Sequence, residues 1–363
     1  MKPSSNLLFA AGCVFLTECI SAGLTDPSQH PEVLEALAIN VALVHYTDFA
    51  SRSEEMAQAS VTFCTTPDEA AITTLREAAW AARGPWKRSE VILFGPVVDY
   101  PLRLGPKLDD WPVNGEAVED LVAADSKLDQ TAFDAMGSAT RGLPVVEYLL
   151  WADADGTAPL AALTRNNRRC DVLVGAATDV ALNATRLRDA WQNEWVIQLS
   201  DPSTVENSAY ETTQSVVDEW VNRMAFTVEN IRVTKLGKPA GDDSNGALQP
   251  DIIESRLSGR SLTDARDALQ GVYDVWTGQV GDGELGIRDL VQNDTVVEQL
   301  GELFTLAVER LDRLTDPLEE TLLVEPEMIA WAQEPLRQLQ TAIQSELATA
   351  VGTTLQFNDA DGD

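Results

Sequence analysis

Glu147 is the side chain of this sequence that most needs a chemical partner, because it lies in a strongly apolar stretch ending at Trp151. A buried carboxylate requires a hydrogen-bond donor, a cation or a metal beside it. The nearest candidate along the chain is Arg141, although a metal or a ligand would serve as well. Pro144 cannot donate to the carbonyl of Thr140, so a helix here must kink or restart and leave backbone oxygen free. The segment is therefore a candidate site, and a kinked helix with a Glu–Arg pair is the structural alternative.

Histidine restricts the catalytic chemistry, because the chain holds only His30 and His45. A zinc peptidase of the H-E-x-x-H type needs two histidines one helical turn apart, and no such pair occurs. A Ser-His-Asp or Cys-His hydrolase would have to use one of these two, and neither lies in a recognisable motif. The sequence therefore disfavours a hydrolase.

The N-terminal residues 1–22 are predicted to be a secretory signal peptide, with an apolar run at 7–16 between Lys2 and a cluster of small residues. That run is too short to span a bilayer, and no other segment is expected to cross one. Cys13 closes a pattern typical of a lipoprotein box, so a lipid anchor at Cys13 is the alternative to cleavage near Ala22. Both routes export the protein, to the periplasm or to the outer membrane.

Export would place the remaining cysteines in an oxidising compartment. If Cys13 and Cys19 leave with the signal, Cys64 and Cys170 remain, and such a pair is a disulfide candidate in an oxidising compartment. The bond would close a loop of roughly 100 residues, worth on the order of 4 to 5 kcal/mol in the chain-entropy model. Two buried thiols are the alternative, and two cysteines alone cannot make a structural zinc site.

Acidic residues dominate the composition. The 363 residues include 26 Lys and Arg against 58 Asp and Glu, giving a net charge of −32. This balance excludes electrostatic capture of nucleic acid or anionic lipid. The hydrophobic share of 44% is well above the disordered range, so we expect the acid to cover a folded chain.

Helical periodicity supplies the fold class. Three stretches carry apolar residues at spacings of three or four, typical of helices with one buried face. These residues are Leu173, Ala176, Val180, Ala184, Leu187, Trp191, Trp195 and Leu199; Leu300, Leu303, Ala307, Leu311 and Leu314; and Ile329, Leu336, Leu339, Ile343 and Leu347. A further helix is expected to begin at an N-cap Thr66 with Pro67 as its first residue. Because a polar break follows Trp151, we predict an all-α protein of two packed helical bundles, residues 30–155 and 156–363.

Several segments together resemble the imelysin-like proteins, also known as imelysin peptidases. Gly142 and Glu147, followed by an aromatic and aliphatic run, match the family's G-x-H-x-x-E motif, and Pro144 occupies the histidine place. The segment 256–261 is similar to the family's Arg-Ser-Gly-x-Ser segment, and 357–363 is similar to its Phe-Asn-x-x-Asp-Gly-Asp ending. The resemblance covers nearly the whole mature chain.

The resemblance implies a two-domain helical protein with its site between the domains, linked either to bacterial iron uptake or to metal-dependent peptidase activity. With Arg141 and Pro144 added from the residue argument, the candidate ligand-binding set is Arg141, Gly142, Pro144, Glu147, Arg256, Ser258, Gly259, Ser261, Asn358, Asp361 and Asp363. The spacing of the terminal aspartates is similar to the first half of a calcium loop, but no distal Glu follows, so an acidic tail is expected rather than an EF-hand.

Pro144 in place of histidine changes the expected chemistry. A cation at this place would meet oxygen donors, with Glu147 as the candidate metal ligand, and oxygen suits iron or another hard cation better than zinc. We therefore expect weak or no transition-metal binding, and an exported binding protein of the cell envelope with uptake components as partners. A metallopeptidase, or a module that binds a peptide or protein without catalysis, is the alternative.

Overall fold

The computed structural model describes residues 30–153 and 156–356, and within these ranges the chain is helical and contains no β-strand. The predicted all-α class is confirmed. The long helices are α2 (Val44–Thr65), α3 (Glu69–Arg88), α9 (Asn167–Ala190), α11 (Thr213–Glu229), α13 (Ser261–Thr277), α14 (Asp294–Asp312) and α16 (Glu327–Ala342). The shorter ones are α1 (His30–Ala36), α4 (Gly105–Leu108), α5 (Gly115–Ala123), α6 (Gln130–Ala135), α7 (Leu143–Trp151), α8 (Pro159–Arg165), α10 (Val196–Ser200), α12 (Lys238–Ala240), α15 (Leu318–Val324) and α17 (Ala348–Val351).

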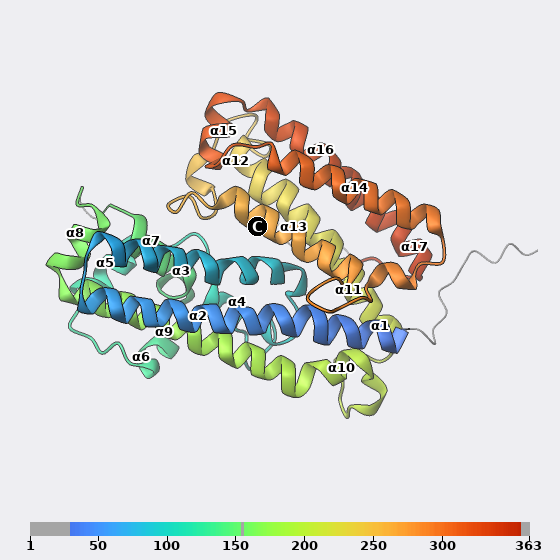
Figure 1. Ribbon diagram of the computed structural model, residues 1–363, viewed down its shortest axis with the longest axis horizontal. Coiled ribbons are helices and arrows are strands. Elements are labelled where there is room, and N and C mark those ends of the chain that lie inside the picture. Colours follow the sequence, from blue (N-terminus) through green and yellow to red (C-terminus); the bar gives the residue numbers. More distant parts are fainter. Residues whose placement is uncertain (1–29, 154–155, 357–363) are drawn as a thin grey trace, which may run out of the picture.

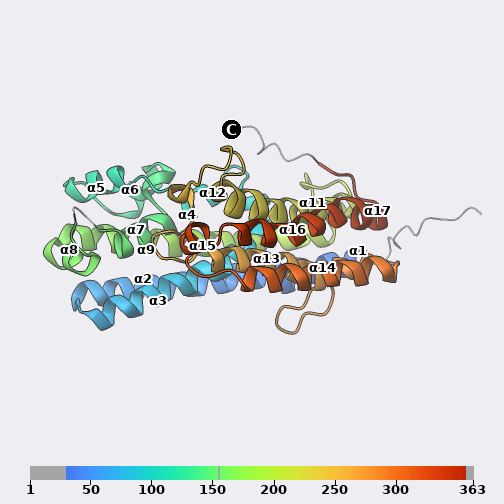
Figure 2. The ribbon, with the colours of Figure 1, turned by 90° about the horizontal axis from the view of Figure 1, so that it is seen from above.

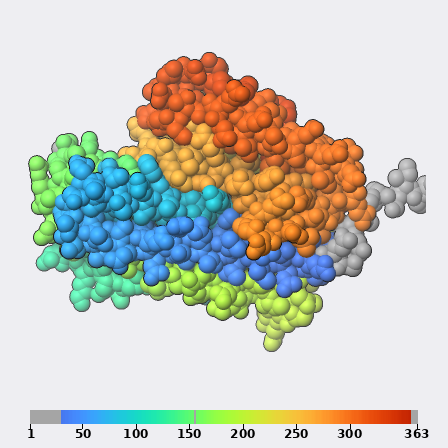
Figure 3. Space-filling view, in the orientation of Figure 1, coloured from blue at the N-terminus to red at the C-terminus, as the bar shows by residue number. Residues whose placement is uncertain are grey.

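The long helices form two layers (Figure 1). One layer holds α2, α3 and α9 side by side, and the other holds α11, α13, α14 and α16. Figure 2 shows the same grouping from above, and Figure 3 shows the two layers meeting along a continuous surface. α13 contacts α3 as well as α11 and α14, so it lies at the junction.

The grouping of helices around residue 155 is more interleaved than the sequence indicates. α9 follows that position yet packs extensively against α2, so helices from both sides of residue 155 share one layer. The division into two bundles at this point stays a prediction.

The apolar stripes are buried as their spacing predicts. In the stripe that runs through α9, residues Leu173 to Leu187 are fully buried, and Trp191 beyond the helix is also fully buried. The Trp191 ring lies 5.2 Å from that of Tyr46 on α2 and 5.5 Å from that of Phe94. Phe94 in turn lies 5.1 Å from Trp220 on α11, so one aromatic cluster joins the layers.

The predicted N-cap of the helix after residue 66 is wrong by two residues. The N–H of Thr66 bonds to the carbonyls of Thr62 and Phe63, so Thr66 ends α2. Asp68 caps α3 instead, with its side chain accepting from the N–H of Ala71 at 2.7 Å. A carboxylate at this position also complements the positive end of the helix.

Cys64 at the end of α2 and Cys170 at the start of α9 form a disulfide, with 5.7 Å between their Cα atoms. The bond ties two neighbouring helices of one layer at the same end. It closes a loop of 106 residues.

One helix is longer and more apolar than the sequence analysis allowed. The continuous helix His30–Thr65, which includes a π-helical segment at Leu37–Leu43, meets the length and hydropathy of a membrane span, with a mean hydropathy of 1.3. In the most apolar 18-residue stretch of this helix, 56% is buried inside the protein, as expected of a core helix. The predicted signal at 1–22 and Cys13 lie outside the described residues.

Candidate functional site

Two predicted site segments meet where Ser258 contacts Glu147, 111 residues earlier in the chain. Glu147 lies on α7, and Ser258 lies in the turn before α13. Oε1 of Glu147 accepts two hydrogen bonds from Ser258, one from its backbone N–H at 2.8 Å and one from its Oγ at 2.6 Å. Burial raises the pKa of Glu147, while Arg83 and the two bonds from Ser258 lower it in part. Donors of this chain therefore satisfy one oxygen of the motif carboxylate.

Arg141, the nearest partner predicted for Glu147, binds Asp179 of α9 instead. Its Nε lies 2.9 Å from Oδ2 and its Nη2 lies 2.6 Å from Oδ1, and both side chains are buried. Arg141 precedes α7 in extended backbone (φ −145°, ψ 178°) and is therefore not on the same helix as Glu147. Glu147, the acid expected from its nearness in the sequence, is not the partner of Arg141. The actual partner, Asp179, is 38 residues from Arg141.

Gly142 and Pro144 shape the start of α7. Gly142 has φ +83°, and a Cβ at this position would lie 2.5 Å from the carbonyl oxygen of Leu108. The site therefore accepts glycine for both backbone and packing reasons. Pro144 is the second residue of the helix, where its missing N–H interrupts no helical bond. The helix restarts here, which was one of the two predicted outcomes, and it has no mid-helix kink.

The remaining predicted residues are spread around the turn that carries Ser258. Arg256 pairs with Asp251 at 2.6 Å and with Glu319 at 3.2 Å, and it is partly exposed. Gly259 has φ +70°, and Ser261 is the buried first residue of α13. Asn358, Asp361 and Asp363 lie outside the described residues.

A buried network of charges that the sequence analysis missed lies next to Glu147. We call it the Arg83 cluster, and it comprises Arg83, Lys87, Glu90, Asp109, Lys235, Glu254 and Asp264. Arg83 on α3 donates to Asp264 of α13 at 2.7 Å and to Glu254 at 3.2 Å. It also lies 3.4 Å from Asp109. The cluster therefore links the two layers.

Two lysines complete the cluster. Lys87 donates to Glu90 at 2.9 Å, to Asp109 at 2.8 Å and to Glu254. Lys235, on the π-helical segment Asn230–Gly237, donates to Glu90 at 2.9 Å and to Glu254. Glu254 therefore accepts from three cations.

The pKa values follow these contacts. Burial pushes the pKa of Glu254 upward, but Lys235, Lys87 and Arg83 outweigh it and hold that pKa well below its usual range. Burial likewise disfavours the charged form of Lys87, and Asp109 and Glu254 reverse the effect, so its pKa is raised well above the ordinary value. Such mutual compensation keeps the buried groups ionised.

A cavity of about 360 Å³ lies beside the Arg83 cluster. Its walls include Lys87, Glu90, Glu254 and the rings of Trp86 and Trp111. Oε2 of Glu90 is buried and has no hydrogen-bond partner among the described residues. The cluster therefore faces a space of the size that suits a small ligand.

The described residues do not fit a catalytic transition metal. No group of three or more His, Cys, Asp or Glu side chains in these ranges is arranged to hold an ion. The helix α7 contains no histidine, and Oε1 of Glu147 already accepts two hydrogen bonds. A catalytic zinc needs three protein ligands with nitrogen among them. No metal-dependent step is therefore derived for this site.

Comparison with known proteins decides the family. The imelysin family model matches residues 42–351. The chain belongs to the imelysin family. Among curated relatives of this imelysin protein, iron-regulated protein A of Synechococcus elongatus is 26% identical over 331 residues, covering 88% of this chain and 86% of the relative.

Solved structures show the same fold at low identity. An iron-regulated protein A precursor from Parabacteroides distasonis superposes with a TM-score of 0.77 at 20% identity, covering 91% of this imelysin chain and 97% of that chain. An imelysin-like protein from Psychrobacter arcticum gives a TM-score of 0.75 at 17% identity, covering 92% and 99%. The word precursor for the first of these agrees with the N-terminal apolar stretch of this chain, which is consistent with a signal sequence.

Proposed function

We propose that this imelysin protein is an exported binding protein of the cell envelope, linked to iron or metal uptake, and that its ligand engages the junction between two helical domains at Glu147. The contact between Glu147 and Ser258 carries the proposal, because it brings together two family segments from opposite layers. The adjacent Arg83 cluster and its cavity supply charged groups and space for a ligand. The iron-regulated relative supports the link to iron.

The potential metal ligands around Glu147 favour binding without catalysis. Glu147, with its raised pKa, is a single carboxylate whose Oε1 is saturated by Ser258, and the described residues offer no imidazole beside it. A peptidase would need a ligand set that these residues do not form. The predicted hard-cation preference and the envelope uptake partners remain parts of the proposal, and a lipid anchor at Cys13 remains the alternative to signal cleavage near Ala22.

Native mass spectrometry and metal analysis of the protein from its own cell envelope test this function. The proposal predicts a retained small molecule or hard cation in the wild type and its loss in Glu147→Ala. Glu77→Ala is a matched control, because Glu77 is an exposed carboxylate on α3 outside the proposed site. Chelator-sensitive cleavage of a denatured protein substrate by the purified wild type would contradict it.

A further inference from the structure

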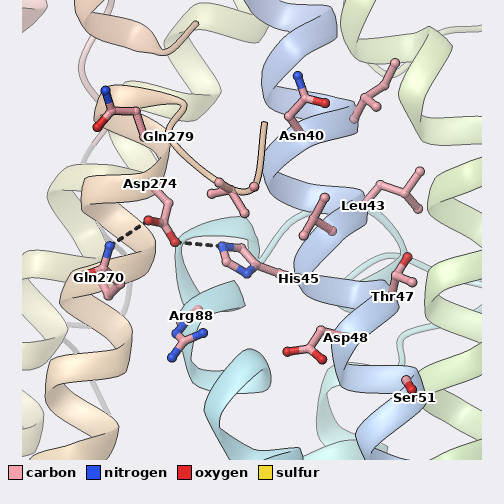
Figure 4. A pocket seen from close by; sticks show the side chains of 14 residues that line it. Asn40, Leu43, His45, Thr47, Asp48, Ser51, Arg88, Gln270, Asp274 and Gln279 are labelled. Carbon is pink, nitrogen blue, oxygen red and sulfur yellow. Dashed lines mark hydrogen bonds and ion pairs between the residues drawn. The ribbon is translucent and has the colours of Figure 1, made fainter. Parts of the chain in front are cut away.

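A second, larger pocket lies away from Glu147, between α2 with the preceding π-helical segment and α13 with the loop that follows it (Figure 4). Its volume is about 1000 Å³. One part of its wall is apolar, formed by Leu43, Val44 and Val280, and another part is polar. This combination of an apolar wall with a few polar groups is typical of a small-molecule site.

His45, which lies in no recognisable sequence motif, lines this pocket beside a carboxylate. Its Nε2 lies 3.0 Å from Oδ2 of Asp274, and Gln270 donates to Oδ1 of the same carboxylate at 2.7 Å. The carboxylate of Asp274 therefore faces the Nε2 side of the imidazole, although Nε2 forms no well-aligned hydrogen bond among the described residues. Figure 4 shows Nδ1 directed away from Asp274.

Asp48 and Arg88 bring opposite charges to the same pocket wall (Figure 4). The Asp48 side chain is 44% exposed, and its only hydrogen bond or ion pair among the described residues is the 3.3 Å bond from the exposed Arg52 to one oxygen. The Arg88 side chain is 40% exposed and meets a single oxygen of Asp267 at 3.2 Å. Each charge therefore keeps unused hydrogen-bonding capacity toward the pocket.

We propose that this pocket binds a small zwitterion with an apolar body, namely an amino acid or short peptide with a free ammonium and a free carboxylate. The ammonium donates to Asp48, which lies three residues after His45 on the same face of α2. The carboxylate accepts from Arg88, and the side chain packs on Leu43, Val44 and Val280. A zwitterion satisfies both charges and adds no net charge to an acidic protein.

Calorimetric titration of the wild-type protein with leucine and two analogues tests the charge requirement without any mutation. Leucine should saturate the pocket, whereas 3-methylbutylamine, which lacks the carboxylate, and 4-methylpentanoate, which lacks the ammonium, should each bind about tenfold more weakly. Dileucine distinguishes a free amino acid from a short peptide. The N-trimethyl derivative of leucine should also bind more weakly, because it has no N–H to donate to Asp48.

Charge-removing variants assign the two ends of the ligand. Asp48→Asn should weaken leucine about tenfold and leave 4-methylpentanoate unchanged, and Arg88→Gln should weaken leucine and leave 3-methylbutylamine unchanged. Asp171→Asn and Arg165→Gln, at exposed positions outside the pocket, should bind leucine as the wild type does. The proposal is overturned if neither leucine nor dileucine binds saturably below about 1 mM. It is equally overturned if a singly charged analogue binds as tightly as leucine, or if both pocket variants bind leucine normally.

Discussion

Ser258 donates both its backbone N–H and its hydroxyl to the same oxygen of Glu147, at 2.8 and 2.6 Å. The contact explains how a carboxylate on the apolar helix α7 is held by hydrogen-bond donors of this chain. It also connects the turn 255–260, which leads into α13, directly to α7.

Removal of the Glu147 acceptor should destabilise the protein. Glu147→Ala removes the acceptor of two partly buried donors of Ser258, of which only Oγ keeps a second acceptor, the carbonyl of Ser255 at 3.2 Å, so we expect a loss of about 1 to 3 kcal/mol in the free energy of unfolding. Glu147→Gln retains Oε1 as an acceptor and should remain within about 1 kcal/mol of the wild type at neutral pH. Urea unfolding of both variants measures the difference, and equal destabilisation by Ala and Gln would contradict this account.

The Arg83 cluster should make stability fall in acid. The folded-state pKa of Glu254 is held well below its usual range, so its contribution is present above the unfolded pKa, about 4.3, and is lost as pH falls through the folded pKa. Glu147 has the opposite sign, because its raised pKa favours proton binding in the folded state. Unfolding midpoints measured from pH 6 downward should show a drop below about pH 4. The same drop in Glu254→Gln would show that other groups cause it.

The disulfide between Cys64 and Cys170 should be a major part of the stability. Because it closes a loop of 106 residues, the chain-entropy model gives on the order of 4 to 5 kcal/mol. The double variant Cys64→Ser with Cys170→Ser should therefore melt well below the oxidised wild type, and added reductant should lower the wild-type melting temperature alone. A reductant effect of equal size on the variant would contradict the assignment.

Gly142 should not tolerate a side chain. Gly142→Ala places a Cβ 2.5 Å from the carbonyl oxygen of Leu108 at a φ of +83°, so we expect a loss of about 2 to 3 kcal/mol. Gly137→Ala is the matched control, because a Cβ there meets nothing within 4 Å. Thermal melts of the two variants give the comparison, and similar melting temperatures would argue against the close approach of α7 and Leu108.

The sequence predicted what depends on local periodicity. The all-α class and the buried stripe through α9 follow from apolar spacing alone, which tertiary packing reinforces. The cap at Thr66 was misplaced because Thr66 and Asp68 are both good N-cap residues, and only the hydrogen bonds of the preceding helix distinguish them.

The candidate site was predicted in part. The family segments drew attention to Glu147 and Ser258, but their direct contact spans 111 residues and cannot be inferred from spacing. The Arg83 cluster was missed, because its members come from five separate segments and look like surface charges in the sequence. The available signal was the pair Lys87 and Lys235, because lysine is scarce in this acidic chain.

The central claim is that Glu147 belongs to a binding junction and not to a catalytic transition-metal site. Calorimetric titration of zinc into the purified wild-type protein and into Glu147→Ala tests it most directly. The account predicts no stoichiometric zinc site of submicromolar affinity in either protein. A stoichiometric, submicromolar zinc site in the wild type that is lost in Glu147→Ala would contradict it.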